Sequence, residues 1–209
     1  MRALVRGWLL AVGISAVVAP SALAATGGAA APGGTTQSTP PAPTAAPAPT
    51  PPPVPTPPPA TVTPGGTVPG NKAKLGPDGQ ALAPANAPDP VKYAIWAGNQ
   101  LQAMPYVYGG GHEDFVDTGY DCSGTVSYAL HGGGLLQVPQ DSSDLESWGL
   151  EGPGAWITVY TNPGHAYMVI AGLRLDTSKA GDPRGQSGPR WRKRLRDNTG
   201  YDARHFAGL

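Results

Sequence analysis

The sequence GYDCSG, residues 119–124, contains the only cysteine of this 209-residue chain. Cys122 therefore has no partner for a disulfide within the chain, and a solitary thiol in a secreted protein usually serves chemistry or pairs with another chain. Residues 123–130 have helical composition, and the glycines 132–134 end that pattern. Cys122 is thus predicted to begin a helix, where free backbone amides and the helix dipole stabilise a thiolate.

The sequence on both sides of the cysteine predicts a helix and an antiparallel sheet. Upstream, Asp89-Pro90 has the residue types of a helix N-cap and first position, and apolar residues recur at helical spacing up to Met104-Pro105. Downstream, residues 156–160 and 165–171 have the aromatic and β-branched content of strands, and residues 173–177 can return as a third strand. Helices followed by an antiparallel meander predict an α+β domain.

The first 24 residues have the pattern of an export signal. Arg2 and Arg6 precede an apolar core, residues 8–18, and the small-x-small sequence 22–24 follows as a cleavage site. Because this core is shorter than a membrane span, we expect cleavage, with an uncleaved anchor as the alternative. Residues 25–88 are rich in Ala, Pro, Thr and Gly, which predicts a disordered, extended spacer.

Residues 89–209 remain as a single domain of modest size. The chain has zero formal net charge, but residues 25–173 carry −7 and residues 174–209 carry +5. The basic sequence RWRKRLR, residues 190–196, either binds an anionic polymer or docks on the acidic part of its own domain. An exported chain of neutral balance, without a recognised binding motif, is not expected to bind nucleic acid.

A cysteine nucleophile needs a base that accepts its proton and a polar group that orients the base. His165 is the candidate base, because residues 162–164, NPG, deliver it to the first position of a predicted strand. If residues 171–172 form a two-residue turn, Asp176 is the diagonal neighbour of His165, roughly 7 to 8 Å away between backbone positions. We therefore predict Asp176 as the orienting residue; a turn or salt-bridge role beside Arg174 is the alternative.

No metal or other cofactor is expected, because the single cysteine and the four scattered histidines have none of the usual ligand spacings. The sequence HED at residues 112–114 is explained more simply as a polar loop tip than as a metal site. The glycines 109–111 lack the lysine and the strand–helix context of a phosphate loop. We interpret them as a flexible segment or as room for close approach of a substrate.

Three short strings together resemble a known family. PYVYGG at residues 105–110, DCSG at residues 121–124 and Gly164-His165, in this order and at these separations, are similar to the NlpC/P60 cysteine peptidases. Those enzymes cleave peptidoglycan stem peptides in bacterial cell walls. The resemblance spans most of residues 89–177 and implies a reduced papain-like fold, with the cysteine helix packed against an antiparallel sheet.

The resemblance also implies roles for individual residues. Cys122 matches the nucleophile and His165 the general base, and Tyr106 matches a tyrosine whose hydroxyl lies near the family's cysteine. Tyr106 and Ser123 are expected on the substrate and oxyanion side of the thiol. The implied reaction is amide hydrolysis by acyl transfer, with the Cys122 backbone amide stabilising the developing oxyanion.

The chain departs from the family pattern in two places. GAW at residues 154–156 stands where the family usually has a Gly-Asp-Leu/Val start of the first core strand. The family's third catalytic residue is commonly His, sometimes Asn or Gln, whereas Asp176 occupies the nearest place here. Ser178 and His205 remain alternative third residues.

The expected function is a secreted, cell-envelope cysteine peptidase acting on peptidoglycan peptides, with no stable membrane insertion. An anionic cell-wall polymer is a further candidate partner, through the basic sequence 190–196. Three alternatives remain open. They are a non-catalytic wall-binding module on a degenerate peptidase fold, a lipid acyltransferase or thioesterase of the same fold, and a dimer linked through Cys122.

Overall fold

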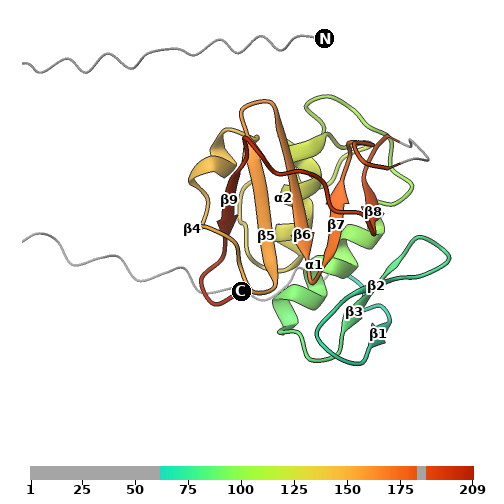
Figure 1. Ribbon diagram of the computed structural model, residues 1–209. Helices are drawn as coiled ribbons and strands as arrows, with labels where there is room; N and C mark the ends of the chain where they lie inside the picture. Colours follow the sequence, from blue (N-terminus) through green and yellow to red (C-terminus); the bar gives the residue numbers. More distant parts are fainter. Residues whose placement is uncertain (1–61, 183–186) are drawn as a thin grey trace, which may run out of the picture. The chain divides into compact units, whose positions relative to one another are not determined.

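The computed structural model describes residues 62–182 and 187–209, so the expected export signal and residues 25–61 of the expected spacer lie outside the described residues. Two helices, α1 (Asp89–Gln100) and α2 (Cys122–Gly132), cover one face of a six-stranded sheet (Figure 1). The sheet has the order β4-β9-β5-β6-β7-β8, and all its neighbouring strands are antiparallel. The predicted α+β class is confirmed.

The strands of this sheet are β4 (Leu150–Glu151), β5 (Ile157–Asn162), β6 (His165–Ile170), β7 (Leu173–Asp176), β8 (Arg190–Arg192) and β9 (Asp202–His205). A short 3-10 helix, η1 (Asp144–Ser147), precedes β4. Within the described residues, no helix is long and apolar enough to cross a membrane.

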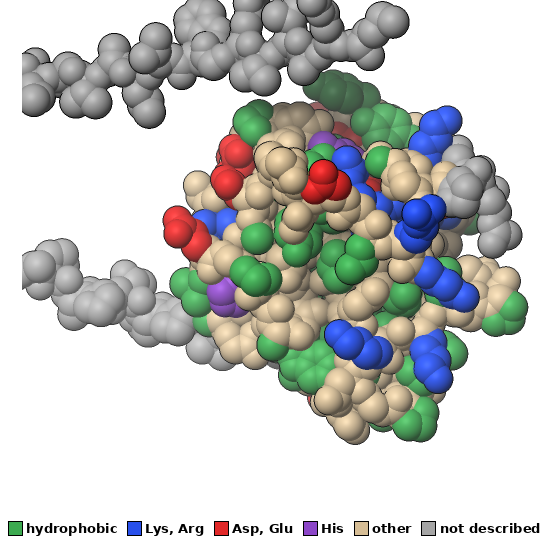
Figure 2. Space-filling model, viewed as in Figure 1, with side chains coloured by type: hydrophobic (Ala, Val, Ile, Leu, Met, Phe, Trp, Pro, Cys, Tyr) green, Lys and Arg blue, Asp and Glu red, His purple; other side chains and the backbone are tan. Residues whose placement is uncertain are grey.

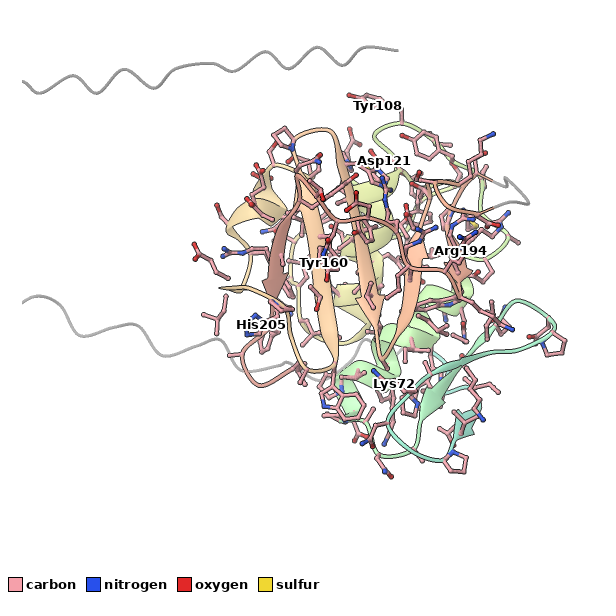
Figure 3. The ribbon with its side chains drawn as sticks, viewed as in Figure 1. Lys72, Tyr108, Asp121, Tyr160, Arg194 and His205 are labelled. Carbon is pink, nitrogen blue, oxygen red and sulfur yellow. The ribbon has the colours of Figure 1, made fainter. Side chains whose placement is uncertain are left out.

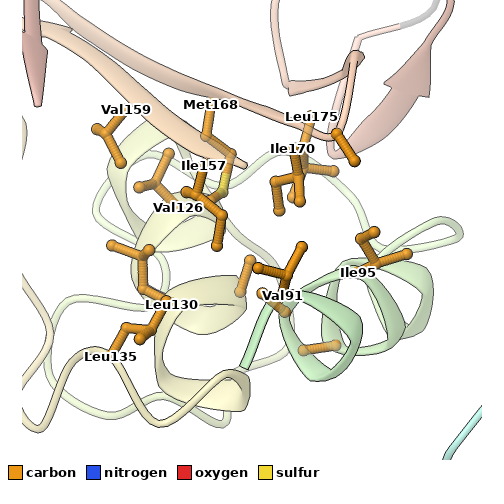
Figure 4. Packing of buried hydrophobic residues seen from close by; sticks show 14 of the residues in the cluster. Val91, Ile95, Val126, Leu130, Leu135, Ile157, Val159, Met168, Ile170 and Leu175 are labelled. Atoms are coloured by element: carbon orange, nitrogen blue, oxygen red, sulfur yellow. The ribbon is translucent and has the colours of Figure 1, made fainter. Parts of the chain in front are cut away.

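The hydrophobic core lies between the two helices and the inner face of the sheet (Figure 4). Fully buried aliphatic side chains of both layers meet there, each contributing about 1.5–3 kcal/mol relative to exposure. They include Val91, Ile95, Val126, Leu130, Ile157, Val159, Met168, Ile170 and Leu175. This packing holds α2 against β6, and it therefore brings the start of the helix close to the start of the strand.

Helix α1 differs from its prediction at both ends. Pro88 is the N-cap, without a side-chain hydrogen bond, and Asp89 is already the first helical residue. The helix ends at Gln100, because the Leu101 amide and the Gln102 side chain both donate to the Gly98 carbonyl (3.3 and 2.7 Å) and close the last turn. The predicted end near Met104 is therefore too late by about one helical turn.

A second, three-stranded sheet precedes α1, with β3 (Ala81–Pro84) between β1 (Thr67–Val68) and β2 (Lys74–Leu75). The spacer prediction is therefore wrong for residues 62–88, and the domain begins earlier than residue 89. Asn99 of α1 accepts a hydrogen bond from the Ala81 amide (2.8 Å) and donates to its carbonyl (3.0 Å), so the sheet is tied to the helix. The buried residues of segment 62–88 are small: Val62, Ala73, Ala81, Ala83, Pro84 and Ala87.

The connection between β6 and β7 is the two-residue turn that the sequence predicts. Ala171 and Gly172 have φ values of +47° and +91°, as a tight hairpin turn requires. Met168 is paired with Leu175, in the expected register. Side chains on the other face of this hairpin, away from the helices, include those of His165 and Asp176.

Candidate active site

Cys122 is the first residue of α2 and is partly buried. The preceding residue, Asp121, is the N-cap, and its carboxylate accepts a hydrogen bond from the Gly124 amide (2.9 Å). The same carboxylate accepts from the Gly109 amide (3.1 Å) and contacts His112 Nε2 (3.0 Å). Asp121 therefore ties the upstream loop to the helix start that carries the thiol.

The glycines of PYVYGG and DCSG pack against each other. A Cβ on Gly124 would collide with the Gly110 carbonyl oxygen, and a Cβ on Gly111 would lie 3.0 Å from the Gly124 Cα. Gly111 also has φ of +80°, which disfavours any larger residue. Gly110 and Gly111 thus serve close packing of the loop on the helix start, which differs from the interpretation as flexibility or space for a substrate, whereas a Cβ at Gly109 would meet no atom within 4 Å.

His165 begins β6, beside the thiol. Its Nε2 lies 3.0 Å from Asp176 Oδ1, and its imidazole is close enough to Cys122 to lower the pKa of the thiol. Because Asp176 occupies Nε2, Nδ1 is the ring nitrogen left for the sulfur. The Asn162 side chain accepts from the His165 amide (2.9 Å) and so holds the hairpin turn that presents the imidazole.

The contacts between thiol and imidazole shift the pKa of both groups. Burial raises the pKa of Cys122, but hydrogen bonds from His165 and the Ala166 amide, with the charge of His165, lower it below its usual value. Burial lowers the pKa of His165, but Asp176 and Cys122 together raise it to about 9. These opposite shifts favour a thiolate–imidazolium pair near neutral pH.

Asp176 is 1% exposed and has a partner on each carboxylate oxygen. Oδ1 accepts from the Ser178 amide (2.7 Å) and binds His165. Oδ2 lies 3.4 Å from Arg174 Nε and accepts from an Arg196 guanidinium nitrogen at 3.3 Å. The two interpretations offered for Asp176, imidazole partner and salt-bridge residue, therefore both describe its contacts.

The side chains of the alternative third residues have other hydrogen-bond partners. The Ser178 hydroxyl accepts from the Ala180 amide (3.2 Å), and His205 on β9 contacts the Gly152 carbonyl through Nδ1 (3.0 Å). Figure 3 shows His205 near the opposite end of the sheet from Asp121, which precedes the thiol. The structure thus brings Asp176 to His165, and it does not bring His205 there.

Tyr106 and Ser123 have different environments beside Cys122. Tyr106 is 47% exposed, and burial together with the negative charges of Cys122 and Asp121 raises its pKa. Its role beside the thiol stays a prediction. The Ser123 side chain is buried, and its hydroxyl contacts Asp121 (3.2 Å) and His112 (3.0 Å). The expected substrate contact through this hydroxyl is therefore not supported.

Sequence reasoning missed the position of His112. It was expected at a polar loop tip, but its Nε2 contacts both Asp121 (3.0 Å) and Ser123 (3.0 Å), the two neighbours of Cys122. Glu113 and Asp114 are exposed, as a loop tip would be.

Across residues 62–182 and 187–209, no group of three or more His, Cys, Asp or Glu side chains is arranged to hold a metal ion.

The basic sequence 190–196 divides into inward and outward side chains. Arg192 is buried and pairs with Asp182, and Arg196 pairs with Asp176, so part of the stretch docks on acidic groups of its own domain. Lys193 and Arg194 are exposed, and Figure 3 labels Arg194. Lys and Arg side chains gather on the side of the molecule that carries β8 (Figure 2).

No model of a known protein family matches the sequence, and a search of curated proteins gives no match. Solved structures do resemble it. RipB of Mycobacterium tuberculosis, a peptidoglycan hydrolase, is 24% identical with a TM-score of 0.42, over 56% of this chain and 64% of that chain. NlpC1 of Trichomonas vaginalis is 15% identical with a TM-score of 0.41, over 58% of this chain and 45% of that chain.

RipD of Mycobacterium tuberculosis is described as a non-catalytic NlpC/P60 domain protein adapted to peptidoglycan binding. It is 15% identical with a TM-score of 0.42, over 57% of this chain and 98% of that chain. The chain spans less than two thirds of the lengths of RipB and NlpC1. Over 56–58% of its length, this chain thus has NlpC/P60 proteins as structural neighbours, among them one hydrolase and one non-catalytic protein.

Proposed function

We propose that this chain is a cysteine hydrolase that cleaves amide bonds in peptidoglycan stem peptides. The observation that carries the proposal is the 3.0 Å contact between His165 and buried Asp176, with the imidazole close enough to Cys122 to lower the pKa of the thiol. A nucleophile, a base and an orienting anion in this order are the components of acyl-transfer catalysis. The solved neighbours include a non-catalytic protein, so the argument for catalysis rests on this chain's own residues.

In the proposed reaction the Cys122 thiolate attacks the carbonyl carbon of the scissile amide. In this proposal the backbone amide at the start of α2 and the Tyr106 hydroxyl donate to the oxyanion. Protonated His165 then gives its proton to the leaving amine, which produces a thioester between Cys122 and the acyl part of the substrate. His165, now neutral, deprotonates the water that hydrolyses this thioester.

Asp176 has a defined part in this cycle. Its Oδ1 holds the Nε2–H of His165 (3.0 Å), which leaves Nδ1 to exchange a proton with the sulfur and the leaving group. Its negative charge stabilises the imidazolium of the resting enzyme. An anion in this place serves the same orienting purpose as the neutral or basic third residues that the family resemblance implies.

The substrate class and location are inferred from the sequence. The strings PYVYGG, DCSG and Gly164-His165 resemble those of peptidases that act on peptidoglycan peptides. The expected export signal places the protein in the cell envelope or outside the cell. An anionic cell-wall polymer remains a further candidate partner for the exposed Lys193 and Arg194.

The chain from Ala25 onward, as wild type and as Cys122→Ala, is incubated with soluble muropeptides under reducing conditions, and the products are analysed by mass spectrometry. We expect new fragments with wild type alone, and the masses of the two fragments together should exceed the mass of the intact muropeptide by one water. Intact muropeptides, from a folded wild type whose thiol still reacts, would contradict the proposal. Binding without turnover would then favour a wall-binding module, and turnover of an acyl ester would favour a lipid-acyl enzyme.

A further inference from the structure

The segment between β8 and β9 crosses the outer face of the sheet in front of β5 and β6 (Figure 1). It follows the strings that resemble the peptidase family, and the sequence alone assigned it no part in catalysis. Its position is established by contacts: the Asn162 side chain donates to the Gly200 carbonyl (3.1 Å), and Tyr201 packs edge-on to Tyr167 at 5.2 Å. The crossing segment, residues 193–201, therefore covers the hairpin that presents His165.

Arg196 is the residue of the crossing segment that reaches the candidate site. One guanidinium nitrogen donates to Asp176 Oδ2 at 3.3 Å, and the other donates to the Tyr201 hydroxyl at 3.1 Å. The guanidinium also lies over the rings of Tyr167 (5.1 Å) and Tyr201 (5.2 Å). Its side chain is 17% exposed. Four contacts thus determine where its charge lies.

Arg174 approaches the same carboxylate but holds it differently. Its Nε lies 3.4 Å from Asp176 Oδ2 without hydrogen-bond geometry, and its Nη2 donates a hydrogen bond to the Ala180 carbonyl (2.9 Å). Arg196 therefore supplies the directional bond to Oδ2, whereas Arg174 supplies mainly charge. A carboxylate that lost the Arg196 bond could rotate toward Arg174 and carry Oδ1 away from His165.

We propose that Arg196 is a positioning residue of this active site, which holds Oδ2 of Asp176 so that Oδ1 stays on Nε2 of His165. The effect reaches the thiol through two further contacts, from Asp176 to His165 and from His165 to Cys122. The inference rests on the proposed function for its effect on turnover. Its effect on the reactivity of the thiol does not require any substrate.

The single cysteine makes the thiol readout specific. Alkylation of the chain by iodoacetamide reports on Cys122 alone, and its rate against pH follows the fraction of thiolate. The experiment measures this profile for wild type, Arg196→Gln, Asp176→Asn and the double variant. Arg194→Gln is the matched control, because Arg194 belongs to the same basic stretch and is exposed.

We expect Arg196→Gln to slow alkylation near pH 6 by about ten-fold, the size of one charge-assisted hydrogen bond, and to move the profile to higher pH. In a protein that already carries Asp176→Asn, Arg196→Gln should not change the alkylation profile further, because Arg196 is proposed to act on the thiol only through Asp176. Arg194→Gln should match wild type. If Arg196→Gln shifted the alkylation profile equally in wild type and in Asp176→Asn, or shifted it in neither, the proposal would be overturned.

Milder variants keep the test valid if Arg196→Gln unfolds. Tyr201→Phe removes the hydroxyl that holds the second guanidinium nitrogen and keeps the ring, and Arg196→Lys keeps the charge without the planar geometry. Both should shift the alkylation profile less than Asp176→Asn does, and neither should shift it in a protein that already carries Asp176→Asn.

With muropeptides, the same variants should lower kcat and leave KM unchanged. A wild type that shows these alkylation shifts but no hydrolysis would refute the proposed function and leave the positioning role intact.

Discussion

Asp176→Asn tests the centre of the proposed mechanism, because it removes a charge and nearly preserves shape. Asp176 and Cys122 together raise the pKa of His165 from 6.5 to about 9, against the effect of burial. A shift of this size corresponds to about 3 kcal/mol of preference for the imidazolium. If Asp176 supplies about half of it, the substitution costs roughly 2 kcal/mol, or a thirty-fold change in an equilibrium constant.

Two assays measure that change independently. The pKa of His165, followed by NMR titration of its ring protons, should fall well below 9, and the alkylation profile of Cys122 should move to higher pH. Hydrolysis of muropeptides by Asp176→Asn should fall by one to two orders of magnitude without disappearing, because the thiol and imidazole remain. Asp176→Ala should lose as much or more.

The substitution also leaves Arg174 and Arg196 beside a neutral amide, which destabilises the fold. Thermal unfolding of each variant is therefore measured first, and the assays are run well below the lowest Tm. Wild-type values of both the His165 pKa and the rate of hydrolysis in a folded Asp176→Asn variant would refute the assignment of Asp176 as the orienting residue.

Four further outcomes follow from the structure. Cys122→Ala and His165→Ala should each abolish hydrolysis while the protein remains folded at the assay temperature, and retained turnover in either would contradict the mechanism. Asp121→Ala removes the N-cap and the ties to the loop, so we expect a loss of about 1–2 kcal/mol or more in unfolding free energy, measured by urea denaturation. Gly124→Ala should prevent folding, seen by circular dichroism, because its Cβ would overlap the Gly110 carbonyl. The raised pKa of His165 adds stability that is complete below about pH 6.5 and is lost as pH rises toward about 9; this loss should be absent from unfolding curves of His165→Ala.

Much of the candidate site could be predicted because its determinants are local. The helix composition after Cys122 and the glycines that follow it specify where the thiol lies on its helix. The period of two along β6 and β7, with the two-residue turn at Ala171-Gly172, specifies the register, and the register brings Asp176 beside His165. Each step depends on residues only a few positions apart.

The sheet at residues 67–84 could not be found in this way. Its buried side chains are mostly alanines, which lie within a composition that otherwise indicates a spacer. These alanines are buried because they pack against α1 and its Asn99, and that surface of the helix forms only when the domain folds. Small apolar residues give no amphipathic signal large enough to separate a thin packed layer from an unstructured segment.

The residues that surround the catalytic candidates also divide into those that local sequence predicts and those that only the tertiary structure decides. Helix start, strand register and the pairing of His165 with Asp176 follow from local sequence, because backbone geometry repeats over a few residues. The contact of His112 with Asp121 and the contact of Arg196 with Asp176 depend on chain segments that meet only in the folded domain. Charge and hydrogen bonding act across space and leave no period in the sequence, so the tertiary structure alone decided which cation holds the carboxylate.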